Sequence, residues 1–104
     1  MEKRIYHIVS PEDWEAAERS GEYRAASLVD EGFIHCSFAE QLDTVLERYY
    51  SGAGTVNILE IDPGRLTAEL VEEPSTNNEI YPHIYGPLDL DAVVGVSTRE
   101  APES

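Results

Sequence analysis

Short apolar runs of strand length dominate the hydrophobic pattern of this chain. They are rich in β-branched and aromatic residues and cover Arg4–Val9, Thr55–Ile61, Leu66–Glu72, Ile80–Tyr85 and Val93–Thr98. This length and composition predict β-strands. The first run carries apolar residues on both faces, which predicts a strand inside a sheet rather than at its rim. Pro82 removes a ladder donor from the run around it, so we expect that strand at an edge or a bulge.

The first helix is predicted by signals at both of its ends. Ser10 is a good N-cap residue before Pro11, and Gly21 supplies the usual C-terminal signal. We therefore expect a helix from Pro11 to about Arg19. Its apolar face is limited to Trp14 and one alanine, which predicts a surface helix anchored by the tryptophan.

A second helix should follow the predicted strand Phe33–Ser37. Ser37 stands three residues before Glu40, the spacing of a capping box, so the strand should turn directly into a helix. The apolar stripe of that helix falls at i, i+3, i+4 and i+7 and consists of Leu42, Val45, Leu46 and Tyr49. In the loop before the strand we expect one helical turn, around Ser27–Asp30.

The order of the elements predicts the fold class. The helices fall in the first half of the chain and the strands mainly in the second, which favours an α+β fold over an alternating parallel one. At 104 residues the chain is expected to be a single domain, residues 1–104.

The charge and the cysteine count narrow the functional classes. Twenty-one acidic residues against seven basic ones give a formal net charge of −14, which repels phosphate backbones and predicts no nucleic-acid partner. The single cysteine excludes an internal disulfide, and no secretory leader is apparent. No apolar run approaches the ~20 residues of a membrane span. We expect a cytoplasmic protein without a membrane partner.

The three histidines are the first candidates for chemistry, because histidine titrates near neutral pH. His7, His35 and His83 all lie in predicted strands. Alternation along a strand puts His35 on the same face as Ser37, and His83 on the same face as Tyr85. Such pairs can hold a ribose or a phosphate, or orient a general base. They can also be simple cross-strand hydrogen bonds.

Other reactive residues carry weaker signals. No pair of histidines or cysteines has the spacing of a zinc motif, so no metal is expected. Cys36 points away from His35 toward the presumed core, where a thiol is usually inert. Glu73 and Glu79 bracket a polar loop and could orient a ribose hydroxyl or act as a base, although acidic side chains are usually solvated. For an anionic ligand, Arg24 and Arg4 are the cations nearest these residues; Arg24 is the one we take as a binding residue.

Several short motifs together resemble one family. They read IYHIV, SPEDW, GEYRAASL, EGFIHCS, EPS and PHIYGPLDLDAVV, and they extend from Ile5 to about Val96. The chain resembles the domain-of-unknown-function family numbered nine-five-two. That family is similar in fold to the ADP-ribosyltransferases and RNA 2′-phosphotransferases, which grip NAD in a cleft between two small antiparallel sheets.

The resemblance implies a fold, a ligand and a set of site residues. It implies two helices on two small, mostly antiparallel sheets, with NAD or ADP-ribose as the small-molecule partner and NAD as the cofactor. His7, His35 and His83 would converge as catalytic residues of an ADP-ribosyl or phosphoryl transferase. The residues expected to bind the ligand are Ser37, Tyr85, Arg24, Trp14, Glu73 and Glu79. A sensor that has lost the chemistry, or a metal-dependent hydrolase, are the alternatives.

Overall fold

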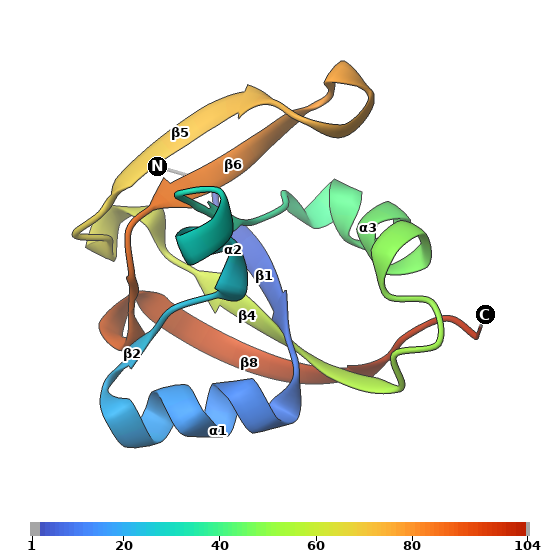
Figure 1. The fold of residues 1–104 in the computed structure, drawn as a ribbon, viewed down its shortest axis with the longest axis horizontal. Coiled ribbons are helices and arrows are strands. Elements are labelled where there is room, and N and C mark those ends of the chain that lie inside the picture. The colour runs from blue at the N-terminus through green and yellow to red at the C-terminus, as the bar shows by residue number, and fades with distance from the viewer. Residues whose placement is uncertain (1–2, 104) are drawn as a thin grey trace.

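The computed structural model describes residues 3–103, except for the side chain of Thr76. Its strands and α-helices follow one another as β1 (Ile5–Val9), α1 (Pro11–Ser20), β2 (Glu22–Tyr23), α2 (Ala26–Asp30), β3 (Ile34–His35), α3 (Leu42–Tyr49), β4 (Thr55–Ile61), β5 (Glu69–Pro74), β6 (Ile80–Tyr85), β7 (Leu88–Asp89) and β8 (Val93–Glu100). The three α-helices precede most of the strands (Figure 1), so the α+β prediction is confirmed. The helical turn expected around Ser27–Asp30 is the short helix α2.

The strands form small antiparallel sheets. β1, β4 and β8 make one sheet with β4 in the centre, and β3, β6 and β5 make a second with β6 in the centre. β2 and β7 pair as a two-stranded ribbon. The β5–β6 hairpin extends past α3 at one side of the molecule (Figure 1). The expected pair of small sheets is therefore present, with the ribbon in addition.

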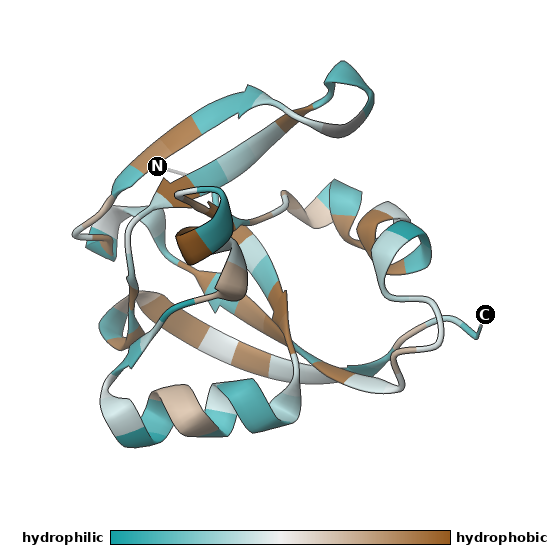
Figure 2. Cartoon of the chain, in the orientation of Figure 1, coloured by the Kyte–Doolittle hydropathy of each residue, from teal (hydrophilic) through white to brown (hydrophobic). Residues whose placement is uncertain are grey.

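Strands β1 and β4 of the first sheet are covered on both faces, whereas β8 is largely exposed. Successive residues of β4 alternate in direction, so that Ile61 packs in a cluster with Trp14 of α1, whereas Ile58 packs in a second cluster with Leu46 of α3. Figure 2 shows apolar residues along these strands and polar residues at the tip of the β5–β6 hairpin. Burial on both sides explains why these strands read as apolar on both faces.

The segment Ile34–Ser37 joins the two three-stranded sheets. Its first two residues pair with β6. The N–H of Cys36 then donates to the carbonyl of Pro82 at 3.1 Å. Ser37 exchanges two backbone hydrogen bonds with Tyr6 of β1, at 2.7 and 2.8 Å. One short segment is thus bonded to β6 in its first half and to β1 in its second.

This crossing explains three departures from the predicted strands. The strand expected over Phe33–Ser37 is regular only over Ile34–His35, because the chain leaves β6 for β1. β1 is an edge strand of its sheet rather than an interior one, and its outer edge is covered by Ser37. Pro82 lies in the central strand β6, not at an edge. Its carbonyl accepts from Cys36, so its ring nitrogen points to the same side: the reciprocal bond to Cys36 is missing where β3 ends, and the pairing with β5 loses no hydrogen bond.

The buried imidazole of His7 links β1, β2 and β3. Its Nδ1 lies 2.6 Å from the carbonyl oxygen of His35, and its Nε2 lies 2.8 Å from the hydroxyl of Tyr23. A carbonyl can only accept, so Nδ1 carries the hydrogen, and the Tyr23 hydroxyl donates to Nε2. Burial lowers the pKa of His7 to about 4 and raises the pKa of Tyr23 above its ordinary value. His7 is therefore neutral at pH 7, with both ring nitrogens in use.

Helix α1 begins and ends as its signals predict. The Ser10 hydroxyl accepts from the N–H of Asp13 at 3.1 Å, and Gly21 has the positive φ of 95° typical of a helix C-terminus. Trp14 is buried, as expected for the anchor of a surface helix. In the described part of the chain no helix is both long and apolar enough to span a membrane.

The junction before α3 differs from the prediction. Ser37 is held in the extended bridge to β1 and cannot cap a helix, so the predicted capping box with Glu40 is wrong. A 3₁₀ turn, Ala39–Gln41, precedes α3 instead, and the side-chain oxygen of Gln41 accepts from the N–H of Phe38 at 2.9 Å. The apolar stripe of α3 is present, with Leu42 and Leu46 buried.

The later strands follow the prediction with one displacement. β4 and β6 have the predicted bounds, and β8 extends the predicted last strand at its C-terminal end. β5 covers Glu69–Pro74 rather than Leu66–Glu72. Its start is delayed because the N–H of Thr67 donates to the carboxylate of Asp89 at 2.7 Å instead of to a neighbouring strand.

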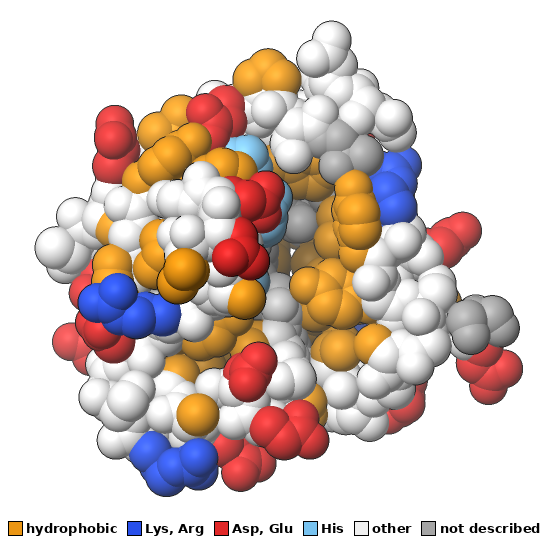
Figure 3. Space-filling model, in the orientation of Figure 1, with side chains coloured by type: hydrophobic (Ala, Val, Ile, Leu, Met, Phe, Trp, Pro, Cys, Tyr) orange, Lys and Arg blue, Asp and Glu red, His pale blue; other side chains and the backbone are white. Residues whose placement is uncertain are grey.

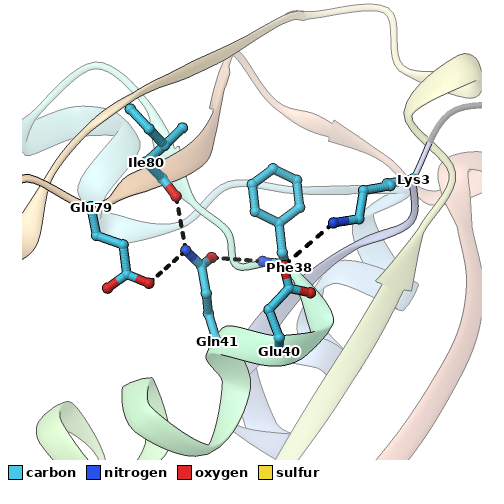
Figure 4. Close-up of polar contacts among 6 residues, drawn as sticks. All are labelled: Lys3, Phe38, Glu40, Gln41, Glu79 and Ile80. Atoms are coloured by element: carbon cyan, nitrogen blue, oxygen red, sulfur yellow. Dashed lines mark hydrogen bonds and ion pairs between the residues drawn. The ribbon is translucent and has the colours of Figure 1, made fainter.

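The side chain of Gln41 connects the start of α3 to the β5–β6 hairpin (Figure 4). Its Nε2 donates to the carbonyl of Ile80 at 2.8 Å and to Oε2 of Glu79 at 3.1 Å, while its oxygen accepts from Phe38. Gln41 is only 7% exposed. The neighbouring Glu40 is exposed and pairs with Lys3 at 3.3 Å (Figure 4).

We expect Gln41→Glu to destabilise the fold by about 1 to 3 kcal/mol, because it removes two buried donors and sets a carboxylate against Glu79. Urea unfolding at pH 7 measures the change. Glu40→Gln, one residue away in the same turn, is the matched control, and we expect it to stay within about 0.5 kcal/mol of wild type. Equal effects of the two substitutions would contradict this role of Gln41.

The environment of His7 predicts a pH dependence of stability. Its pKa is about 4 in the folded protein and about 6.5 when unfolded, so between these values the unfolded chain binds the extra proton. The free energy of unfolding should therefore fall as the pH is lowered from 6.5 to 4, by at most about 3 kcal/mol from this group. Above pH 6.5 the contribution is fully present.

The comparison with His7→Gln isolates this effect, because the carboxylates titrate equally in both proteins. Urea unfolding at several pH values should give the wild type the steeper loss of stability toward acid. Parallel pH profiles for the two proteins would contradict the assignment.

Candidate functional site

Two of the three histidines lie side by side on the outer face of the β3–β6–β5 sheet. His35 and His83 are paired directly across β3 and β6, with ring centroids 5.3 Å apart and ring planes at 86°. Phe33, two residues before His35 on the same face, stacks on the His83 ring at 4.1 Å and 19°. The opposite face of this sheet carries Ile34 and Ile84, which are fully buried in the core. The pair therefore belongs to the face that the core does not use.

A carboxylate holds the His83 ring. Nδ1 of His83 lies 2.7 Å from Oε1 of Glu73, and since a carboxylate accepts, Nδ1 carries the hydrogen. The hydroxyl of Tyr85 also donates to Glu73. These two hydrogen bonds hold the pKa of Glu73 below its ordinary value, and the bond from Tyr85 has the larger effect. The Glu73 carboxylate in turn raises the pKa of Tyr85.

The other ring nitrogen of His83 is left without a partner. Nε2 is buried and makes no hydrogen bond to any described residue. In the neutral imidazole this atom carries the lone pair, because Nδ1 donates to Glu73. A carboxylate-held imidazole with a lone pair on Nε2 is the arrangement of a general base, here covered by the Phe33 ring.

His35 is the imidazole that solvent reaches. Its side chain is 47% exposed, and its Nε2 lies 2.9 Å from Oε2 of Glu31, four residues earlier. Nε2 therefore donates to this carboxylate, and the lone pair of neutral His35 lies on Nδ1. The carbonyl of His35 is the one that accepts from His7.

A cleft of about 540 Å³ opens beside His35. Figure 3 shows the hollow, with histidine and acidic side chains on one wall and hydrophobic side chains on the other. The lining comes from α2–β3, α3 and the β5–β6 hairpin and consists of Glu31, His35, Cys36, Ser37, Val45, Tyr49, Tyr50, Ser75 and Tyr81. Its volume is within the range typical of small-molecule sites.

The predicted convergence of three histidines is met by two of them. The third, His7, bonds to the backbone carbonyl of His35 and not to its ring. The other ring nitrogen of His7 bonds to the Tyr23 hydroxyl in the interior. Ser37 does line the cleft beside His35, as alternation predicted. Cys36 is buried as expected, although it also contacts the cleft, and burial raises the pKa of its thiol.

The remaining predicted binding residues are divided between several places. Glu73 and Tyr85 bind each other behind His83, and Glu79 accepts from Gln41 and from the Tyr81 hydroxyl near the cleft. Trp14 packs in the core under α1. Arg24 pairs with Glu22 at 2.8 Å and lines a separate open cavity of about 550 Å³ beside α1.

Sequence reasoning missed several residues of the cleft. Glu31 could have been found from its i,i+4 spacing to His35, and Tyr81 from its alternation with His83 and Tyr85. The apolar stripe predicted for α3 includes Tyr49, but in the structure this side chain is 57% exposed and lines the cleft. Among the residues that the structure describes, no group of three or more histidine, cysteine or acidic side chains is placed to hold a metal ion.

Comparisons with known proteins identify the family of the chain and structures of similar fold. The model of the family described as "Protein of unknown function (DUF952)" matches residues 8–96. The crystal structure of protein CC0527 from Caulobacter crescentus has a TM-score of 0.82 and 28% identity, covering 94% of this chain and 85% of that one. The solution NMR structure of CC0527 has a TM-score of 0.72 and 28% identity, covering 90% and 82%. No curated protein matches. The chain therefore belongs to the DUF952 family of proteins of unknown function.

Proposed function

We propose that the cleft beside His35 binds a small nucleotide-like molecule, NAD or ADP-ribose, and that His35 acts on it as an acid–base group. The observation that carries the proposal is the imidazole of His35 at the wall of a cleft of ligand size, with the buried imidazole of His83 paired to it across the sheet. Nε2 of His83 is buried without a partner among the described residues, which is unusual for a purely structural residue because buried polar atoms are normally hydrogen-bonded.

The two histidines have different roles in this proposal. His35 lines the cleft and can exchange a proton with a ligand through Nδ1, while Glu31 fixes its tautomer at Nε2. His83, held by Glu73, supports His35 from behind and is a positioning residue. His7 is also a positioning residue, because it binds the carbonyl of His35 from the interior.

The aromatic side of the cleft suits a nucleotide. Tyr49, Tyr50 and Tyr81 offer aromatic rings for a flat base or a pyridine ring, and Ser37 and Ser75 add hydroxyls to the same lining. The net charge of −14 favours a small ligand over a nucleic acid. The reaction class most compatible with an exposed imidazole is transfer of an ADP-ribosyl or phosphoryl group, and a cytoplasmic location is part of the proposal.

Binding of NAD or ADP-ribose should stabilise the protein. At a ligand concentration of 100 Kd the expected gain is about 2.7 kcal/mol, which raises the melting temperature by several degrees. Thermal unfolding across a panel of nucleotides measures it. The absence of any shift at millimolar NAD and ADP-ribose would refute nucleotide binding, whereas binding without consumption of ligand would identify a sensor.

The role of His35 is tested by His35→Ala. We expect a loss of affinity of about tenfold or more, equivalent to about 1.4 kcal/mol, with an unchanged circular dichroism spectrum because the side chain is half exposed. Arg24→Ala, in the separate cavity, is the matched control and should bind like wild type. Equal affinities of the His35 variant and the control, by calorimetry, would remove His35 from the site.

A further inference from the structure

The aromatic wall and the acidic wall of the cleft lie on opposite sides of it. Tyr49 is exposed and Tyr50 half-buried at the end of α3, whereas Tyr81, 7% exposed, comes from β6, the strand that pairs with β3. Glu31 and His35 belong to the segment from α2 to β3, which lies across the hollow from α3 (Figure 1). Figure 3 shows this division, with acidic side chains at one rim of the hollow and hydrophobic ones at the other.

The electrostatics of the cleft are those of a cation site. Among the described residues that line it there is no lysine or arginine, whereas Glu31 contributes a carboxylate. A second carboxylate, Glu79, accepts from the Tyr81 hydroxyl at 3.4 Å. Burial is the main cause that raises the pKa of Tyr81, and the Glu79 carboxylate raises it further. Arg48 lowers it. Neither Glu79 nor Arg48 belongs to the lining, whose carboxylate is Glu31, and the net charge of the whole chain is −14.

These features fit one ligand chemistry. The faces of tyrosine rings attract an organic cation, and the attraction is worth about 0.5 to 2 kcal/mol, more as water is excluded. A carboxylate opposite the rings neutralises the ligand's charge, and it repels an anion. A phosphate in the same place would find a carboxylate and no cation in the lining.

We propose that the group which enters this cleft is a flat organic cation of the pyridinium type, held between the tyrosine wall and the Glu31 carboxylate. The proposal rests on the proposed function only in placing the ligand in the same cleft, and it names which end of the ligand enters. For a dinucleotide such as NAD, the positively charged ring lies inside and the phosphates remain outside. Glu31 is then a binding residue, in addition to holding the His35 tautomer.

Two ligands of nearly the same shape test the proposal. 1-Methylnicotinamide carries one positive charge on its ring, and nicotinamide is the neutral counterpart. We expect the cation to bind at least about tenfold more tightly by NMR titration at low salt, with the largest shifts at Tyr49, Tyr81 and Glu31. Glu31→Gln keeps an acceptor for His35 but removes the charge, and it should abolish the preference. Glu15→Gln, on the exposed face of α1, makes the same change in net charge and should preserve it.

The outcomes separate this inference from the proposed function. Equal affinities for the two rings, or a preference that survives Glu31→Gln, would overturn the cation site even if NAD and ADP-ribose bind. Failure of both rings to bind would overturn it as well. A preference for 1-methylnicotinamide that Glu31→Gln removes would support it, even if neither NAD nor ADP-ribose bound and nucleotide binding therefore failed.

Discussion

The hydrogen bond from His7 to the carbonyl of His35 is the constraint on which the arrangement of this protein depends. It holds the segment that crosses from β6 to β1 at the point where the chain changes sheets. The same imidazole accepts from Tyr23, so the position of β2 is set by the same ring. Because His7 stays neutral in the interior, no charge has to be buried for this link.

The crossing segment also gives the β3–β6–β5 sheet two unlike faces. One face carries Ile34 and Ile84 into the core, and the other carries His35, His83 and Phe33. Strand alternation makes the two sets inseparable, since a shift of one residue would turn the two imidazoles toward the core and Ile34 and Ile84 away from it. A stable core and an exposed imidazole are thus consequences of one register.

The cleft has its shape because each of its three sides is held by its own set of contacts. The His35 side is held by the crossing, the α3 side by its apolar stripe, and the hairpin side by Gln41, which bonds to Glu79 and Ile80. In a small domain with a net charge of −14, a described lining that contains Glu31 and no lysine or arginine favours a neutral or cationic group inside the cleft, with the phosphates of a nucleotide outside it. The charge of the whole chain and the lining of the cleft therefore favour the same kind of ligand.

The sequence by itself determined the features that depend on neighbouring residues. Ser10 and Gly21 defined α1, the heptad-like stripe defined α3, and alternation paired His35 with Ser37, because caps, stripes and faces are set by local geometry. Only the tertiary structure decided which strand is central, where Ser37 bonds, and that His7 is enclosed while His83 meets Glu73. These depend on contacts between residues far apart in the chain, and no local pattern reports which partner a strand edge or a ring nitrogen will find.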